Sequence, residues 1–343
     1  MGKELVQNIT FRTHLVGAVS DFCSISKLTL INPVIHLAEL IVMLAHYKEE
    51  GVKLRPQVYL CNDFDKAMAM LPDGEKFQIG IADPDLNGIK QALKKCAPLA
   101  GENWLIYINE RGKDKIEYGL FRGSTRSIAV PVDSVIMSDG NPDLILVKAF
   151  QIADECIELK SNFKKSHFIF LNNREEDSLP PLQHLDNLVS AVCKNAPKPT
   201  AESLQSYISK LLSTALHASH GSLVAVSTAS NAPKFLSSDG IILENPIDFV
   251  DLITKLKADE YSEPNLNSKA DLVKGMFNSD GIVLFNNRGA LLGYNCFTTI
   301  PKANTVVGGA RKRAFSTLAS RVGNGLSAAF MQSQDGWTDF KGI

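Results

Sequence analysis

Residues 279–285, SDGIVLF, followed at once by NNRG at 286–289, decide how the C-terminal part of the chain is interpreted. The first stretch is an apolar run that begins with an acid and a glycine, and the second is rich in residues that favour tight turns. Another apolar run covers residues 290–299. Two apolar runs separated by such a turn are typical of a β-hairpin, so we predict a buried strand, a turn and a returning strand.

The sequence on either side of this hairpin also alternates between helix and strand patterns. Upstream, residues 200–219 predict one long helix, and HGSLVAV at 220–226 predicts a buried strand directly after it. The apolar face of that helix consists of Leu204, Ile208, Leu211, Leu212 and Leu216. Downstream, GGARKRAF at 308–315 predicts a turn that leads into a helix. Further elements are predicted at 240–244, 246–256 and 327–331. The pattern favours a mixed β-sheet flanked by helices.

The first half of the chain also mixes strands and helices, but it carries no recognisable catalytic signature. Strands are predicted at 57–61, 78–82, 104–109, 116–121, 127–132 (an edge strand) and 167–171, and helices at 33–47, 64–71, 86–96 and 144–159. Polar, proline-bearing stretches at 172–181 and 194–200 mark a junction. We therefore predict an α/β protein. A separate, smaller α/β or α+β domain over residues 1–190 precedes the mixed-sheet domain of residues 200–343.

Composition narrows the classes of function. The 343 residues carry 36 Lys and Arg against 37 Asp and Glu, which argues against nucleic-acid binding by bulk charge. The most apolar early stretch, residues 33–47, is too short to span a membrane, and His36 and Glu39 interrupt it. No signal peptide is visible, so we expect a cytoplasmic protein without a membrane partner. The six scattered cysteines include no Cys-x-x-Cys pair and are expected to be small buried thiols.

Four motifs of the C-terminal part occur in an order that resembles a known family. They are Gly221-Ser222-Leu223-Val224, Asp280-Gly281-Ile282, Gly309-Ala310-Arg311-Lys312-Arg313-Ala314 and Ser333-Gln334-Asp335. The order is similar to that of the diadenylate cyclase domain of the bacterial DNA-integrity scanning protein and its relatives. That family carries Gly-Ala-Leu-Ile, Asp-Gly-Ala, Arg-His-Arg and Ser-Glu-Glu motifs. Asp280 and Arg311 lie 31 positions apart, close to the spacing expected of the family.

The resemblance implies an enzyme that condenses two ATP molecules into cyclic di-AMP and releases two pyrophosphates. Its implied catalytic residues are Asp280, Arg311 and Arg313. Its implied nucleotide-binding residues are Gly281, Ile282, Phe297, Gly309, Ala310, Arg311, Lys312, Arg313 and Ser333. Asp280 and Asp335 would bind Mg²⁺ or Mn²⁺. The resemblance also implies a homo-oligomer whose active sites face each other, and a first domain that acts as a sensor or regulator.

The chemistry of these residue types fits that assignment. The Asp280 carboxylate offers hard oxygen ligands to a divalent cation, and Gly281 lets a nucleotide approach the backbone closely. A helix that starts near Arg311 would favour an anion at its N-terminus. The guanidinium groups of Arg311 and Arg313 can each bind two phosphate oxygens at once.

Four positions depart from the family pattern. Ile282 replaces an alanine, Lys312 replaces the central histidine, Ser279 stands where a histidine often precedes the acid, and Gln334 replaces one acid. These changes leave two further interpretations open. In the first, the chain is a catalytically degenerate receptor for ATP or a cyclic dinucleotide. In the second, it is a cyclase that makes a different nucleotide.

Overall fold

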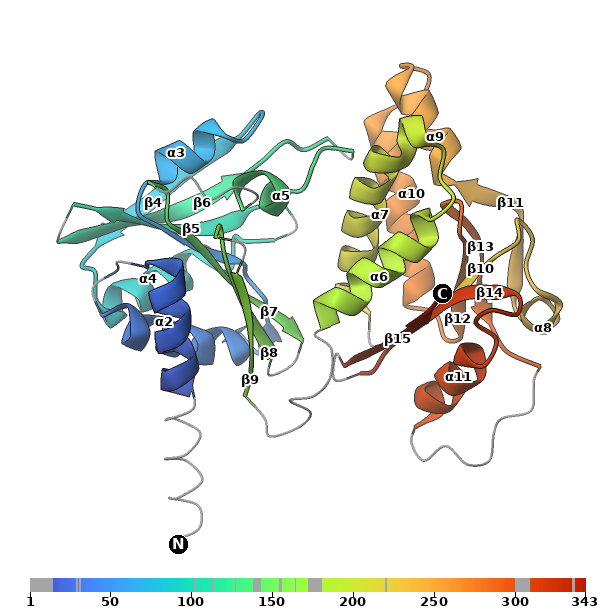
Figure 1. Ribbon diagram of the computed structural model, residues 1–343. Coiled ribbons are helices and arrows are strands. Elements are labelled where there is room, and N and C mark those ends of the chain that lie inside the picture. The colour runs from blue at the N-terminus through green and yellow to red at the C-terminus, as the bar shows by residue number, and fades with distance from the viewer. Residues whose placement is uncertain are drawn as a thin grey trace, which may run out of the picture. The chain divides into compact units, whose positions relative to one another are not determined.

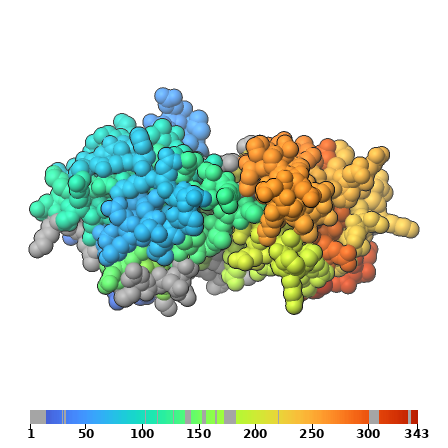
Figure 2. All heavy atoms as spheres, turned by 90° about the horizontal axis from the view of Figure 1, so that it is seen from above, coloured from blue at the N-terminus to red at the C-terminus, as the bar shows by residue number. Residues whose placement is uncertain are grey.

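The chain divides into two compact units, residues 1–125 with 131–178 and residues 126–130 with 179–343. The computed structural model describes residues 15–28, 30, 32–101, 103–112, 114–126, 128–137, 143–153, 156–163, 165–171, 181–219, 221–299, 309–334 and 337–343. In Figures 1 and 2 the first unit runs from blue to green and the second from yellow-green to red. The units are similar in length, so the first is not the smaller one.

The first unit is a seven-stranded mixed sheet with helices on both faces. Its elements are α2 (Pro33–Ala45), α3 (Phe64–Ala69), α4 (Leu86–Cys96), α5 (Val132–Ile136), β1 (Lys48–Glu49), β2 (Val52–Lys53), β3 (Val58–Cys61), β4 (Glu75–Ala82), β5 (Leu105–Arg111), β6 (Lys115–Arg122), β7 (Leu146–Ala153), β8 (Cys156–Ser161) and β9 (Lys165–Phe170). Residues 15–26 are also helical. The sheet order is β4-β6-β5-β3-β7-β8-β9, while β1 and β2 form a separate ribbon. Helices α2 and α4 share one core with the sheet, and α3 and α5 share the other.

The second unit is a six-stranded mixed sheet, again with a core on each face (Figure 1). Its elements are α6 (Pro181–Cys193), α7 (Lys198–Ala218), α8 (Lys234–Ser237), α9 (Phe249–Lys257), α10 (Glu263–Phe277), α11 (Ala310–Ala319), β10 (Ser222–Ser227), β11 (Ile241–Asp248), β12 (Ile282–Asn286), β13 (Ala290–Cys296), β14 (Leu326–Gln332) and β15 (Thr338–Gly342). The sheet order is β11-β13-β12-β10-β14-β15. Helices α6, α7, α9 and α10 pack on one face, and α8 and α11 pack on the other.

The two sheets share one topology. In each, the first and third strands in chain order lie parallel at the centre, and the other pairings are antiparallel. The order β4-β6-β5-β3-β7-β8 in the first unit therefore corresponds to β11-β13-β12-β10-β14-β15 in the second. The same α/β architecture is built twice along the chain.

Local sequence signals explain where several helices begin. The Asp85 carboxylate accepts the Gly88 N–H at 2.7 Å and caps α4, and the Asp248 carboxylate accepts the Val250 N–H at 2.9 Å and caps α9. The helix predicted over 200–219 is α7, and its five apolar positions are all buried, as expected for a core-facing stripe. Asn32 precedes α2 in a left-handed conformation without a side-chain cap, so Pro33 is the stronger start signal there.

Two predicted elements of the first unit are wrong. The helix expected over 144–159 is instead the strands β7 and β8. Residues 146–149, which include Lys148, are all buried, so both faces of β7 are covered there. The strand therefore lacks the alternation of buried and exposed residues that would distinguish it from a helix. The edge strand expected over 127–132 is also absent from its described residues, 128–132, because Pro131 precedes α5 as its N-cap.

Other differences concern element boundaries, cysteines and membrane spans. The helix expected at 246–256 starts only at Phe249, because residues 246–248 belong to β11. The elements α5, α6, α8, α10, β1, β2 and β15 and the helix over residues 15–26 were not predicted. All six cysteines are free, and all but the half-buried Cys193 are fully buried. Among the described residues, every helix is too short or too polar to cross a bilayer.

Candidate functional site

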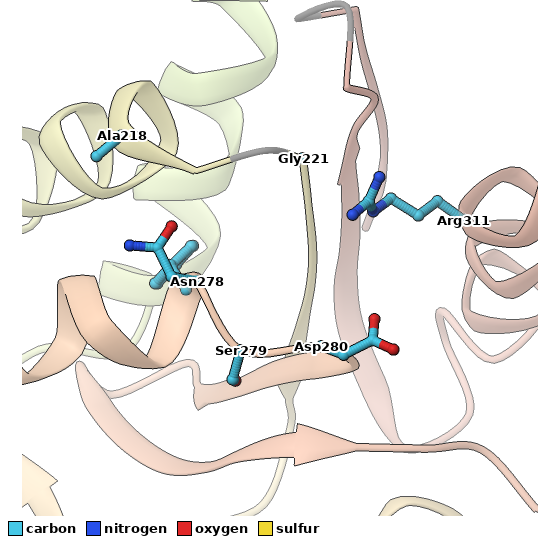
Figure 3. Close-up of a pocket in the computed structure, with 7 residues that line it drawn as sticks. Ala218, Gly221, Asn278, Ser279, Asp280 and Arg311 are labelled. Carbon is cyan, nitrogen blue, oxygen red and sulfur yellow. The ribbon is translucent and has the colours of Figure 1, made fainter.

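A pocket of about 510 Å³ opens at the edge of the second sheet where β10 and β12 begin. It is lined by Ala218, Gly221, Phe277, Asn278, Ser279, Asp280 and Arg311 (Figure 3). Because β10 and β12 are parallel neighbours, their first residues lie at the same edge of the sheet. The pocket is therefore lined by the C-terminal ends of α7 and α10, by the residues that lead into β10 and β12, and by the first turn of α11.

Asp280 lies in the short connection between α10 and β12. The Ser279 hydroxyl donates to the Met276 carbonyl at 2.6 Å, which holds the chain as it leaves the helix. Asp280 is exposed, and its Oδ1 accepts the Gly281 N–H at 3.0 Å. The carboxylate is therefore held at the pocket edge by local bonds and keeps lone pairs that a ligand can use.

Two glycines of the site adopt left-handed conformations, with φ of +101° at Gly221 and +91° at Gly281. A Cβ on Gly221 would lie 2.9 Å from the Gln332 carbonyl oxygen and 3.0 Å from Arg311 Nη1. A Cβ on Gly281 would lie 2.9 Å from the Cys296 carbonyl oxygen. Both backbone angle and space thus require glycine here, and at Gly221 the missing side chain makes room for the arginine.

Arg311 occupies the first turn of α11, for which Gly309 is the N-cap. Its side chain crosses toward Gly221, and the Asp280 side chain extends into the same space (Figure 3). No hydrogen bond or ion pair joins the half-buried guanidinium to the part of the chain that the structure describes. An arginine that lies in a pocket and forms no ion pair within the described residues is well placed to bind a phosphate or carboxylate of a ligand.

The other predicted residues of α11 lie around the pocket and do not line it. Gly309, Ala310 and Lys312 are exposed. Arg313 is half-buried, and its carbonyl accepts the Thr317 hydroxyl at 3.1 Å. The structure thus brings Arg311 to Asp280 and places Arg313 and Lys312 further along the helix surface.

The remaining predicted residues fall into three places. Ser333 borders the site, since its carbonyl carbon would lie 3.0 Å from a Cβ on Gly221. Ile282 is only 2% exposed and packs in the core beneath α11, so it does not line the pocket. Phe297 is 39% exposed, and its N–H donates to the Asp239 carbonyl at 2.7 Å. Asp335 lies outside the described residues.

The carboxylate of the site, Asp280, can bind a divalent cation that enters together with a phosphate ligand. Within the described ranges, His, Cys, Asp and Glu side chains nowhere gather in a group of three or more that could hold a metal ion. Asp280 is the one carboxylate among the pocket residues. Mg²⁺ and Mn²⁺ sites that contain one or two carboxylates complete their shells with water and substrate phosphates, so Asp280 fits that kind of binding.

Three lining residues, Ala218, Phe277 and Asn278, were not predicted from the sequence. Phe277 and Asn278 end α10, a helix whose sequence has a weak apolar period, so its position was not visible. Asn278 is exposed and lines the pocket on the side of Ala218 (Figure 3). The amide offers both a donor and an acceptor to a ligand.

Comparisons of this chain with protein-family models, with curated proteins and with solved structures find no match.

Proposed function

We propose that the second unit binds ATP at the Asp280–Arg311 pocket and that the chain is a diadenylate cyclase. The observation that carries the proposal is the convergence at one sheet edge of an exposed carboxylate, two glycines and a guanidinium that is unpaired within the described residues. Asp280 and Arg311 belong to different elements, and the fold places both on one cavity. A cavity of about 510 Å³ falls within the usual range for small-molecule sites, roughly 300–1,000 Å³.

In the proposed reaction the 3′-oxygen of each ATP bonds to the α-phosphorus of the other, the bond from each α-phosphorus to the β-phosphate bridging oxygen breaks, and two pyrophosphates and two protons leave. Arg311 binds phosphate oxygens and stabilises the charge that develops on them. Asp280 would hold Mg²⁺ or Mn²⁺ together with the phosphates, and that ion supplies further charge neutralisation. Ser333 and Gly309 border the phosphates, Arg313 and Lys312 add positive charge, and Phe297 offers an exposed ring to adenine. Catalysis then consists mainly of positioning and electrostatics.

The proposed site of the second unit holds one ATP per chain, so the proposed condensation needs two chains. We propose a homo-oligomer in which two copies of the pocket face each other, with two-fold symmetry. The first unit then acts as a regulatory domain, and the enzyme works in the cytoplasm, where ATP is available.

A second candidate is a receptor that binds ATP or a cyclic dinucleotide without turnover. The observation that favours it is the single carboxylate among the pocket residues. Binding of a phosphate without turnover requires the Arg311 guanidinium but does not require a second metal-binding acid. The replacement of the family's central histidine by Lys312 points in the same direction.

The deciding experiment incubates the full-length protein with ATP and either Mg²⁺ or Mn²⁺ and identifies products by chromatography and mass spectrometry. We expect cyclic di-AMP from the wild type and a loss of at least about 100-fold in Asp280→Asn and Arg311→Gln, the size expected when a key electrostatic group is removed. Arg288→Gln, on the exposed hairpin turn, is the charge-matched control and should stay active.

Three outcomes separate the candidates. No product from folded wild type, combined with ATP binding that Arg311→Gln weakens, would establish the receptor instead. A parallel incubation with GTP would reveal a cyclase for a different nucleotide. Activity that survives both site substitutions would overturn the assignment of the pocket.

A further inference from the structure

The two units agree in residue-level detail as well as in strand order. The hairpins β5–β6 and β12–β13 carry the same turn pattern, Asn109-Glu-Arg-Gly112 and Asn286-Asn-Arg-Gly289, and both glycines have positive φ. Asn109 pairs in register with Cys61 at the end of β3, and Asn286 pairs with Ser227 at the end of β10. A shared turn at a shared register is what two copies of one fold would show.

A second pair of glycines lies at matching places in the sheets. Gly119 is opposite Tyr107, two residues before Asn109, and Gly293 is opposite Leu284, two residues before Asn286. A Cβ on Gly119 would lie 2.1 Å from the carbonyl oxygen of Phe77, and a Cβ on Gly293 would lie 2.6 Å from that of Ile241. Each glycine thus permits the same close approach to the edge strand β4 or β11.

The first unit lacks the side chains of the proposed active site. Counting back six residues from the matched asparagines places Asn103 at the position of Asp280 and Trp104 at that of Gly281. The helix before β7, α5, has the sequence VDSVI and contains no arginine, whereas α11 before β14 supplies Arg311. The first copy is therefore without the acid, the glycine and the guanidinium of the second.

The first unit has a pocket of its own beside the helices that precede the matching strands. The pocket of the second unit lies between the C-terminal ends of α7 and α10, which lead into β10 and β12. In the first unit a pocket of about 420 Å³ lies between the C-terminal end of α2, strand β1 and the last two turns of α4. Helices α2 and α4 precede the matching strands β3 and β5, so each unit has a cavity beside the helices that lead into its two central strands.

The charged residues that line this second pocket are mainly lysines. Lys48, Lys90 and Lys94 line it, against one carboxylate, Glu49. Glu49 accepts the Tyr47 hydroxyl at 3.1 Å, and burial together with Glu49 raises the pKa of Tyr47 to about 12, so this hydroxyl stays protonated. None of the three lysines forms an ion pair within the described part of the chain.

Helix stability does not account for all three lysines. Lys94 lies in the last turn of α4, where a positive charge is favourable at the helix C-terminus. Lys90 lies one turn earlier, and Lys48 belongs to β1, on a separate element. All three lysines line one cavity, so their positive charges together favour an anion there.

We propose that the first unit is a non-catalytic copy of the second and that its pocket binds a small phosphate-bearing ligand through Lys48, Lys90 and Lys94. The proposal does not depend on the activity proposed above, because it rests on the shared topology and on the lining of a different cavity. His46 and Tyr47 add further polar groups at the same rim.

The test measures ligand binding to the full-length chain by isothermal titration calorimetry without divalent metal, with pyrophosphate and ATP as probes. The pocket of the second unit is silenced by Asp280→Asn and Arg311→Gln together. We expect this chain to bind one equivalent of at least one probe. Adding Lys90→Gln and Lys94→Gln should weaken that binding about tenfold or more, because two charge-assisted contacts are lost.

The control in the same background is Lys66→Gln with Lys115→Gln, two lysines of the first unit outside the pocket. It should leave the affinity unchanged. Absence of saturable binding of both probes in the folded, silenced chain would overturn the proposal. So would an affinity that the Lys90 and Lys94 substitutions change no more than the control does. Neither result bears on cyclic di-AMP synthesis, which is measured separately.

Discussion

The helices α5 and α11 occupy the same place in the two units, between the hairpin and the next strand, yet they use their charges in opposite ways. On α5, Asp133 accepts hydrogen bonds from Tyr59 and from Lys148, the latter at 2.8 Å, and Lys160 lies 3.8 Å away. On α11, Arg311 faces a cavity without a partner in the described chain. A charge that the fold neutralises serves stability, whereas a charge that it leaves open is available to a ligand.

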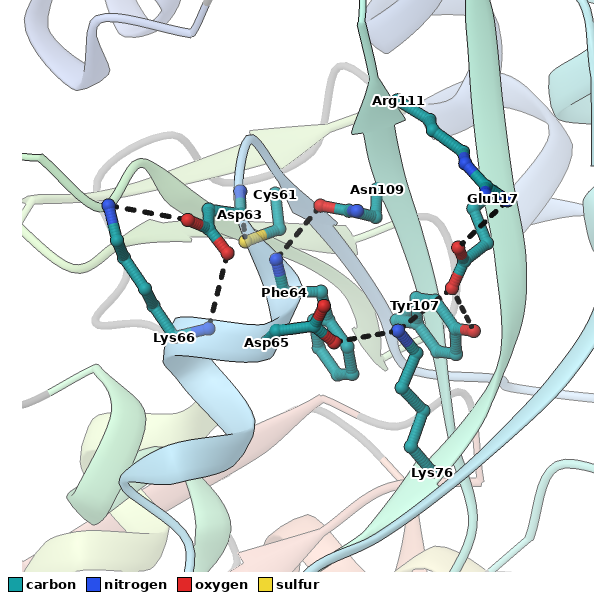
Figure 4. Close-up of polar contacts among 10 residues, drawn as sticks. All are labelled: Cys61, Asp63, Phe64, Asp65, Lys66, Lys76, Tyr107, Asn109, Arg111 and Glu117. Atoms are coloured by element: carbon teal, nitrogen blue, oxygen red, sulfur yellow. Dashed lines mark hydrogen bonds and ion pairs between the residues drawn. The ribbon is translucent and has the colours of Figure 1, made fainter.

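Toward the other edge of the first sheet, charged side chains are again neutralised by partners within the fold (Figure 4). Glu117 accepts the Tyr107 hydroxyl at 2.8 Å and pairs with Lys76 at 2.8 Å, while Lys76 also reaches Asp65 at 2.9 Å. Burial alone would raise the pKa of Glu117, but Lys76, Tyr107 and Arg111 lower it below its usual value. This cluster is internally satisfied, so we assign it a structural role.

The largest effect on stability is expected where the paired charges of the first unit are broken. Burial would raise the pKa of Asp133, but Lys148, Lys160 and Tyr59 lower it. Lys148→Met should destabilise the first unit by about 2–3 kcal/mol, because it removes the buried partner of an ionised carboxylate. Each unit contains one tryptophan, so urea unfolding followed by Trp104 fluorescence in a Trp337→Phe background reports this unit.

The matched variant is Asp133→Asn with Lys148→Met, which removes both charges. It should recover part of the lost stability, because neither partner is then left charged and uncompensated. A Lys148→Met protein as stable as the wild type would show that the Asp133–Lys148 pair does not stabilise the first unit. It would then contradict the structural role assigned to the charge on α5.

An intermediate effect is expected at the open site of the second unit. Gly221→Ala should cost about 1–2 kcal/mol of stability, because alanine is strained at a φ of +101° and its Cβ meets the Gln332 carbonyl. It should also weaken ATP binding by displacing Arg311. Trp337 fluorescence in a Trp104→Phe background measures the first effect, and calorimetry measures the second.

Gly275→Ala in α10 is the control for Gly221→Ala. A Cβ at Gly275 meets nothing within 4 Å, and alanine favours the helix by roughly 0.5–1 kcal/mol. It should therefore stabilise the second unit and leave ATP binding unchanged. Equal responses of the two glycine variants would contradict the tight geometry assigned to Gly221.

The smallest effect concerns the pH dependence of two histidines, one in each unit. Burial lowers the pKa of His184 on α6, whose Nδ1 lies 2.8 Å from the Thr338 hydroxyl, and burial also lowers the pKa of His36 on α2. Each neutral imidazole stabilises its unit above the unfolded pKa of about 6.5, and that stability is lost as the pH falls below it.

His184→Gln should therefore flatten the stability of the second unit between pH 7 and pH 5, a change of up to about 1 kcal/mol. The first unit, followed by Trp104, should keep its slope through His36. The same slope in the wild type and in His184→Gln would show that other groups set the acid sensitivity.

Much of the second unit could be predicted because its signals are local. The hairpin at 279–299, the long helix α7 and the start of α11 all follow from turn residues and apolar periods within a few residues. Asp280 and Arg311 were identified at the ends of such elements. The chain neighbours of a residue are enough to indicate that it ends a strand or begins a helix.

The sequence by itself determined the mixed α/β character of both halves, the Asp-Gly strand start and the basic first turn of α11. Only the tertiary structure decided that β7 and β8 are strands, that Ile282 points into the core, and that Asn278 and Gly221 meet Arg311 at one cavity. It alone also revealed the repeated sheet order. Strand pairing joins residues far apart in the chain, so register, face and shared topology depend on long-range contacts that no local period contains.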